Sequence, residues 1–256
     1  DAGGITIHNA GSMTIAGTVD NLAEISVAAN DVTAGNAGSL ILSGTDVLID
    51  YAKIEASTES TANTDSERVL TAASIDITAT GRFELSNSEI LASTTGGVAA
   101  GDVTLTAQNQ ALNIESTKVE STSESTSETA GQAGSISVFG KAINFIGSLL
   151  NVETESDNTA NNAIADITLD GLGGSVTLQH SASGLAQQGI SASTAGNVNA
   201  GSITIHNASD ITLDSLTLSS KSQTVGSRGS AGSVSLAGTG IIDLKNGATI
   251  ETNTAS

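Results

Sequence analysis

The chain has 256 residues with no cysteine and no proline, and its 27 acidic and 8 basic residues give a net charge of −19 at pH 7. The absence of cysteine excludes a disulfide-stapled scaffold, and the negative surface opposes binding to nucleic-acid phosphates or anionic lipid. No apolar run reaches the roughly 18 residues of a membrane span, so neither nucleic acid nor membrane insertion is expected.

One short phrase, a Gly-Ser pair followed by an apolar-polar-apolar triplet, recurs along the whole chain. Clear copies are Gly134-Ser135-Ile136-Ser137-Val138 and Gly201-Ser202-Ile203-Thr204-Ile205. The copies start near residues 3, 38, 73, 101, 134, 174, 201 and 232, at intervals of 35, 35, 28, 33, 40, 27 and 31 residues. Self-similarity at such a period is typical of a solenoid.

Each repeat contains two further short runs. A second run follows the start by about a dozen residues, as in Leu112-Asn113-Ile114, and a third follows almost at once, as in Val119-Glu120-Ser121. Apolar-polar alternation with β-branched residues is typical of strands that bury one face. The sequence therefore predicts an all-β fold, a right-handed parallel β-helix of about eight turns with three strands per turn, over residues 1–256 as a single segment.

The connections between the runs differ in kind. We expect corners with left-handed backbone at glycines 17, 44, 81, 140, 147, 184 and 238 and at asparagines 21, 87, 109 and 246. The connection after the third run absorbs most of the length variation, and such insertions often mark a binding face. Any ligand contact is therefore expected on the loops 58–71, 121–132, 153–165 and 219–230.

The two ends of the chain carry no evident cap. The sequence begins inside the recurring phrase and stops just after a third run. Because natural proteins cover unpaired strand edges, we expect a fragment of a longer shaft or a unit that stacks end to end.

Three histidines are candidate ligands. His8 and His206 lie in the identical phrase Ile-Thr-Ile-His-Asn-Ala, and His180 ends another copy of the first run. All three are expected near the corner after the first strand, with His8 and His206 six turns apart. Since no partner lies in register, we interpret them as solvated corner residues and expect no metal site.

Paired carboxylates are the alternative to a purely structural chain. Glu55, Glu84 and Glu89, or Asp210 and Asp243, are outward candidates on adjacent turns for glycoside hydrolysis. Few basic side chains and no aromatic platform accompany them, so no catalytic, cofactor-binding or metal-ligating residue is assigned. Weak cation binding, calcium included, by the loop carboxylates remains open.

Hydroxyl pairs end the third strand of most repeats. In register, they predict a hydroxyl ladder that satisfies backbone groups at a corner. An ice-binding array is the alternative, and the uneven repeat lengths oppose it. The pairs are Ser57-Thr58, Ser93-Thr94, Ser121-Thr122, Ser193-Thr194 and Ser219-Ser220.

The succession of phrase, corner, second strand and a third strand such as Gly189-Ile190-Ser191-Ala192-Ser193-Thr194 resembles the shaft repeats of filamentous-haemagglutinin-like secreted exoproteins. The resemblance covers essentially the whole chain. It implies export to the bacterial surface by an outer-membrane secretion partner and a role as an adhesin or biofilm matrix protein. The proline-containing secretion motifs of that family are not in this sequence.

The sequence thus predicts an extracellular structural and adhesive rod without catalysis or cofactor. Its expected partners are neighbouring β-helical repeats and, through the loops, extracellular polysaccharide or a cell-surface receptor. A self-assembling filament subunit and a polysaccharide-degrading β-helical enzyme are the alternatives.

Overall fold

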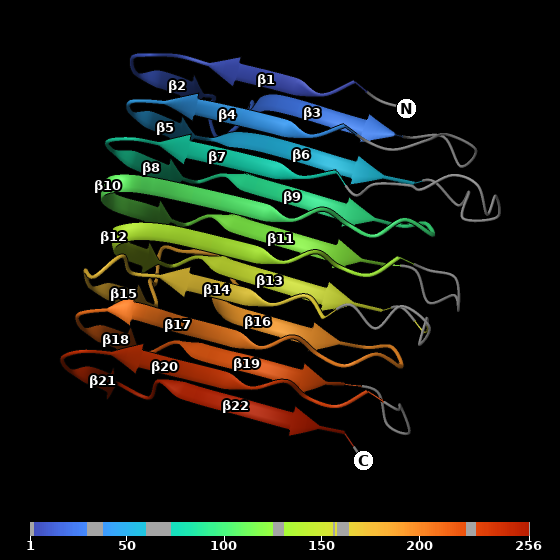
Figure 1. Cartoon of the computed structure of the whole chain (residues 1–256), viewed down its shortest axis with the longest axis vertical. Coiled ribbons are helices and arrows are strands. Elements are labelled where there is room, and N and C mark those ends of the chain that lie inside the picture. The colour runs from blue at the N-terminus through green and yellow to red at the C-terminus, as the bar shows by residue number, and fades with distance from the viewer. Residues whose placement is uncertain are drawn as a thin grey trace.

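The computed structural model describes residues 3–29, 38–59, 73–124, 131–155, 157, 164–223 and 229–255. These residues form 22 strands and no helix. The strands stack into a parallel β-solenoid of about seven turns, with the two termini at opposite ends of the stack (Figure 1).

First and second strands share one 14-stranded sheet, and third strands form an eight-stranded sheet. The first strands are β1 (Ile5–His8), β4 (Leu40–Gly44), β7 (Ile75–Ala79), β10 (Val103–Glu115), β12 (Ile136–Ile146), β14 (Ile167–Asp170), β17 (Ile203–Ala208) and β20 (Val234–Gly238). The separate second strands are β2 (Met13–Ala16), β5 (Val47–Asp50), β8 (Phe83–Ser86), β15 (Val176–Gln179), β18 (Ile211–Asp214) and β21 (Ile242–Lys245). The third strands are β3 (Ala23–Ala29), β6 (Ala52–Thr58), β9 (Glu89–Thr94), β11 (Lys118–Ser123), β13 (Leu149–Thr154), β16 (Gly189–Thr194), β19 (Thr217–Ser222) and β22 (Thr249–Thr254).

The expected three separate strands per turn are not kept throughout. β10 and β12 each run through the first and the second position, with a register irregularity after Ala107 in β10. Their second halves pair with β8 and β15, so the second-strand register continues across them.

The core is built from inward-facing columns of aliphatic side chains. Ile75, Val103, Ile136 and Ile167 pair in sequence across four turns, and each is at most 1% exposed. Phe83 joins the same interior from a second strand. Burying an aliphatic side chain stabilises the fold by about 1.5–3 kcal/mol. Because these side chains stack on those of the neighbouring turns, each turn is stabilised mainly by the turns beside it.

The repeat start near residue 174 is wrong. Val176 pairs with Ile143 of β12 and with Ile211 of β18, so β15 is a second strand. The first strand of that turn is β14, where Ile167 pairs with Ile136. Its phrase, Ala165-Asp166-Ile167-Thr168-Leu169, has Ala and Asp where the other copies have Gly and Ser, which is why the sequence pattern missed it.

Left-handed backbone is confined mainly to the corner after the second strand. Among the predicted corner residues, only Asn87, Gly147 and Asn246 have positive φ, and Tyr51 and Ser116 adopt it without having been expected to. The other predicted corners have ordinary φ, so the expectation of left-handed backbone at them is wrong.

The glycine of the recurring phrase is required by close packing between turns. A Cβ atom on Gly101 would lie 1.1 Å from the carbonyl oxygen of Ala73, and one on Gly201 would lie 1.8 Å from that of Ala165. No side chain fits at these two positions, because the backbones of successive turns touch there.

Candidate functional site

The histidines do not come together. His8 pairs with Ser43, and six steps of register separate it from His206 through Thr78, Thr106, Phe139 and Asp170. At about 4.8 Å per step this is roughly 29 Å, which confirms the predicted separation.

The position expected for His180 is wrong. It follows β15 and therefore lies after a second strand, not after a first strand. The expectation that no partner lies in register is also wrong. His206 is in register with Asp170, and His8 is in register with Ser43, whose hydroxyl lies 2.6 Å from the His8 Nδ1.

The candidate carboxylates lie on different surfaces. Glu84 is on β8 and pairs with Arg82, whereas Glu55 and Glu89 are on the third-strand sheet. Asp210 precedes β18 and its Oδ1 accepts a hydrogen bond from the Ile241 amide at 2.7 Å, while Asp243 is in register with Thr212. The structure therefore separates Glu84 from the other two glutamates, whereas Glu55 and Glu89 lie on adjacent third strands, and Asp210 and Asp243 lie on adjacent turns two positions out of register.

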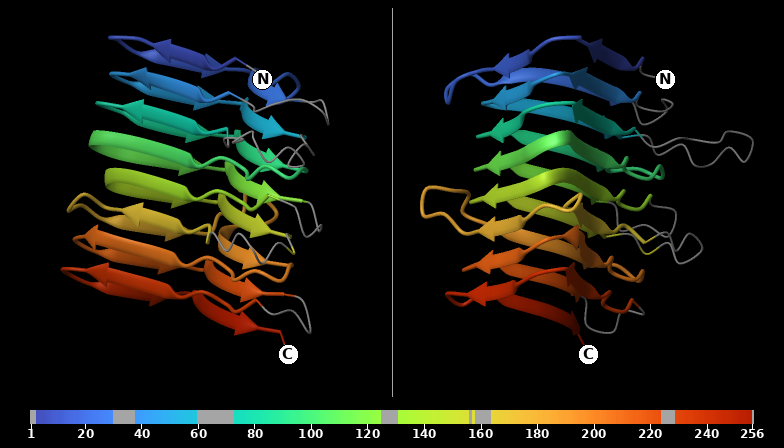
Figure 2. Two further views of the ribbon diagram at one scale, coloured as in Figure 1. Left: turned by 45° about the vertical axis from the view of Figure 1, so that its right-hand side comes forward. Right: turned by 60° about the vertical axis from the view of Figure 1, so that its left-hand side comes forward.

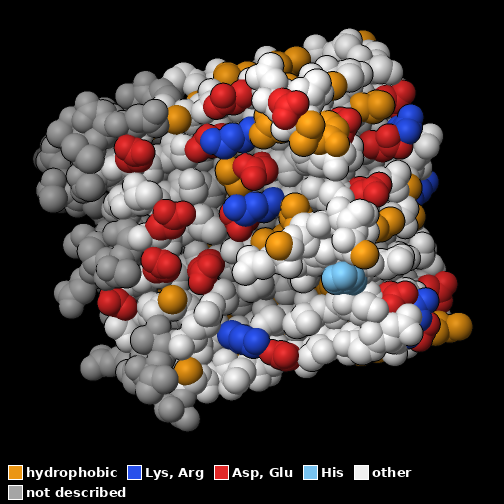
Figure 3. All heavy atoms as spheres, turned by 180° about the vertical axis from the view of Figure 1, so that it is seen from behind, with side chains coloured by type: hydrophobic (Ala, Val, Ile, Leu, Met, Phe, Trp, Pro, Cys, Tyr) orange, Lys and Arg blue, Asp and Glu red, His pale blue; other side chains and the backbone are white. Residues whose placement is uncertain are grey.

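Charges of opposite sign alternate along one column of the third-strand sheet. Glu24 pairs in register with Lys53, Lys53 with Glu89, and Glu89 with Lys118. The hydrogen bond to Glu55 is the main cause that raises the pKa of Lys53; burial lowers it, and the nearby carboxylates raise it further. On the face seen in Figure 3, Lys and Arg side chains lie beside acidic ones. Adjacent opposite charges favour the stacking of turns.

The hydroxyl ladder at the end of the third strands exists in a corrected register. Its inward column contains Thr94, Ser123, Thr154 and Thr194, each at most 5% exposed. The predicted pair Ser121-Thr122 therefore lies one position off, and the pair Ser219-Ser220 lies two positions off, because Ser222 is the residue in register with Thr194. These hydroxyls bond to backbone, as when Ser123 donates to the Gly131 carbonyl at 2.5 Å. The predicted structural role is confirmed.

A second buried hydroxyl column, which the sequence reading missed, lies at the corner before the third strands. The backbone amide of Ala52 donates to the Ser88 hydroxyl at 3.0 Å, that of Ser88 to Thr117 at 3.3 Å and that of Thr117 to Ser148 at 3.0 Å. Each turn thus caps an amide of the turn before it. A Ser or Thr just before the third run, at 88, 117 and 148, was the available signal.

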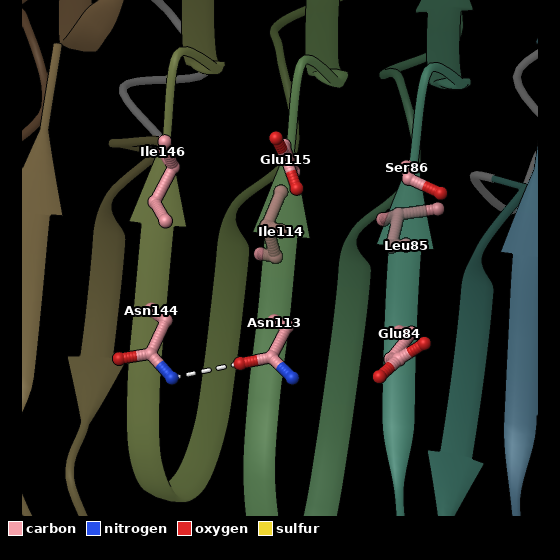
Figure 4. Close-up of a pocket in the computed structure, with 8 residues that line it drawn as sticks. All are labelled: Glu84, Leu85, Ser86, Asn113, Ile114, Glu115, Asn144 and Ile146. Carbon is pink, nitrogen blue, oxygen red and sulfur yellow. Dashed lines mark hydrogen bonds between the residues drawn. The ribbon is translucent and has the colours of Figure 1, made fainter. Parts of the chain in front are cut away.

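A shallow pocket of about 290 Å³ lies on the second-strand surface. Figure 4 shows Glu84, Asn113 and Asn144 in a row on β8, β10 and β12. Asn144 Nδ2 donates to Asn113 Oδ1 at 2.7 Å, so the two amides form a short ladder between turns.

A groove of about 550 Å³ lies on the third-strand sheet beside the connection 180–188. This connection stands out from the solenoid in the right-hand view of Figure 2, where it is yellow to orange. The groove is lined by Leu149, Asn151, Glu153, Ala186, Gln187, Gln188, Ser191, Ser193 and Gln223.

The connection 180–188 was not among the predicted binding loops. β15 was interpreted as a first strand, and no second run was identified between it and the third run Ile190-Ser191-Ala192. The predicted loops 58–71, 121–132, 153–165 and 219–230 lie partly outside the described residues, at 60–71, 125–130, 156, 158–163 and 224–228. Their starts are wrong where the structure describes them, because residues 121–123, 153–154 and 219–222 belong to the third strands β11, β13 and β19.

The pKa of Glu153 is raised, first by burial and then by the negative charges of Glu155 and Glu120. Hydrogen bonds from Asn151 and Gln223 act in the opposite direction. Gln223 Nε2 lies 3.3 Å from Glu153 Oε1 and links β13 to the end of β19.

In the described part of the chain, no three His, Asp or Glu side chains are grouped so that they could hold a metal ion. The same residues contain no helix that could span a membrane. No protein-family model matches the sequence, and neither the curated proteins nor the solved structures contain a match to it.

Proposed function

We propose that the chain is a segment of an extracellular structural and adhesive rod, of the kind found in bacterial surface adhesins or biofilm matrix proteins. The observation that carries this proposal is the unbroken register of the stack. The third strands alone pair from β3 to β22 without interruption. In such a quasi-one-dimensional fold each turn contacts only its neighbours, so added turns lengthen the rod without changing its cross-section.

The proposed handedness is right-handed, because parallel strands joined by crossover connections are right-handed in nearly all proteins. The rod would act mechanically. Continuous backbone ladders and an aliphatic core keep it stiff, so that it holds a binding region away from the surface that carries it. The net charge of −19 opposes lateral sticking between rods. Export by an outer-membrane partner belongs to the same proposal and rests on the resemblance of the repeats.

The test is the location of the native protein. Antibody fragments raised against the purified chain are applied, with gold labels, to whole and permeabilised cells. Label on the outside of intact cells, on projections or in the surrounding matrix, is the expected result. Label that requires permeabilisation, and stays inside, would overturn the proposal.

A further inference from the structure

We propose that the groove between the connection 180–188 and the third-strand sheet binds a neutral, extended glycan that lies along the rod axis. The inference rests on the proposed function, since it gives the adhesive rod a defined site and ligand class.

The connection 180–188 forms one wall of the groove, and hydrogen bonds hold this wall in place without a ligand. The Gln188 side chain makes three hydrogen bonds to the backbone of its own connection: it accepts from the Ser181 amide at 2.8 Å and donates to the carbonyls of Ser181 and Leu185, each at 2.7 Å. The Leu185 amide donates to the Gly147 carbonyl at 2.9 Å, which ties the wall to the preceding turn. A preformed wall lowers the ordering cost of binding.

The lining offers the mixed chemistry that sugar hydroxyls need. Asn151, Gln187 and Gln223 carry amides that both donate and accept, and Ser191 adds a hydroxyl. A sugar hydroxyl is itself both donor and acceptor, so it finds partners of either kind. Leu149 and Ala186 contribute the small apolar patches that the C–H faces of a sugar ring contact.

The groove continues along the axis across successive turns. Asn151 and Glu153 also line a neighbouring groove of about 350 Å³ that reaches Glu120 and Thr122 on β11. In register, Glu120, Asn151 and Ser191 form one outward column, and Thr122, Glu153 and Ser193 form the next. Their spacing of about 4.8 Å is close to the rise of one hexose in an extended β-1,4-linked chain, so successive sugars can lie against the polar side chains of successive turns.

The charge of the surface selects against acidic glycans. Glu120, Glu124, Glu153 and Glu155 all line the neighbouring groove. The nearest described lysines are engaged, because Lys118 pairs with Glu120 and Lys221 with Glu251. A uronate or sulfate group would therefore meet uncompensated negative charge, whereas a neutral hexose would not.

The probes are cellohexaose and chitohexaose, with hexamannuronate as the acidic comparison, each titrated into the folded 256-residue chain and followed by calorimetry and ligand-observed NMR. Three proteins are compared: the wild type, Asn151→Ala/Gln187→Ala in the groove, and Asn113→Ala/Asn144→Ala in the pocket of Figure 4. The last is a matched control, because it removes two outward amides from a surface that lacks the wall. Thermal unfolding of each verifies the fold.

The wild type and the control are expected to bind at least one neutral hexasaccharide with equal affinity and not to bind hexamannuronate. The groove variant should bind about tenfold more weakly, since it loses two sets of hydrogen bonds. Absence of binding to both neutral probes, equal binding by all three proteins, or preference for hexamannuronate would overturn the inference. Such a failure would leave the rod itself intact, because cell labelling tests the rod without reference to any sugar.

Discussion

Gly147 and Gly184 are in direct backbone contact, since a Cβ atom on Gly184 would lie 2.5 Å from the Gly147 Cα. Gly147 also has a φ of +59°, so it serves both the corner after the second strand and the docking of the connection 180–188. The wall of the groove thus depends on two residues that lack side chains.

Gly184→Ala is expected to displace this connection. The added methyl group meets backbone atoms that cannot rotate away, and overpacking of this kind costs about 1–3 kcal/mol. Amide hydrogen exchange over 181–188 should accelerate and the free energy of unfolding should fall. Gly238→Ala is the control, because its Cβ would have 3.5 Å of space. Equal exchange in the two variants would contradict the assigned contact.

Thr117→Val should destabilise the fold by about 1–3 kcal/mol. Thr117 is fully buried; its hydroxyl donates to the Glu115 carbonyl at 2.8 Å and accepts from the Ser88 amide. Valine keeps the shape but leaves the buried Ser88 amide without its hydrogen bond, while the Glu115 carbonyl keeps only the bond from the Asn87 amide. Urea unfolding of this variant is compared with Thr104→Val, an outward position on β10, where the change should be small. If the two variants unfold alike, the buried column does not have the role given to it here.

Ser116→Gly is expected to stabilise the chain by about 0.5–1 kcal/mol, because Ser116 has a φ of +48° and left-handed backbone is costly for residues with a Cβ atom. The equivalent corners are already occupied by Asn87, Gly147 and Asn246. Ser137→Gly, at an extended strand position, should destabilise instead. Thermal unfolding of the two variants checks both signs, and a loss of stability in Ser116→Gly would refute the argument.

Glu153 should make stability depend on pH. Burial and the charges of Glu155 and Glu120 raise its folded pKa above the ordinary value of 4.5, so the folded state binds a proton more tightly than the unfolded state. Stability from this group is therefore present below 4.5 and is lost as the pH rises through the folded pKa. Glu153→Gln removes that loss, so its stability relative to the wild type should grow as the pH rises through this window and then level off. If the difference in unfolding free energy between the two proteins does not change with pH, the pKa of Glu153 is not raised in the folded state.

The sequence was informative about the fold because one periodicity encodes two requirements. Alternation as in Ile203-Thr204-Ile205 gives each strand a buried face. The glycine before the triplet, as at Gly201, allows the backbones of successive turns to approach closely. Where a turn meets these requirements with other residues, the pattern fails. Ala165-Asp166 replaces Gly-Ser at β14, and the second strand β15 carries the stronger copy of the phrase.

The connection 180–188 at the candidate site was not predicted either. The connection 180–188 has no periodic signature, and its shape depends on side-chain hydrogen bonds of Gln188 and on the contact between two glycines 37 positions apart. Such contacts follow from the register of the stack, which a local pattern does not contain. By contrast, the separation of His8 from His206 needed only the count of turns and was predicted correctly.

The most direct test of the rod is cryo-electron microscopy of the native protein. The account predicts rods with an axial spacing of about 4.8 Å, in which the turns of this segment continue without a break into further turns at both ends. Compact particles in which these turns stand alone, enclosing a cleft lined by carboxylates, would contradict it.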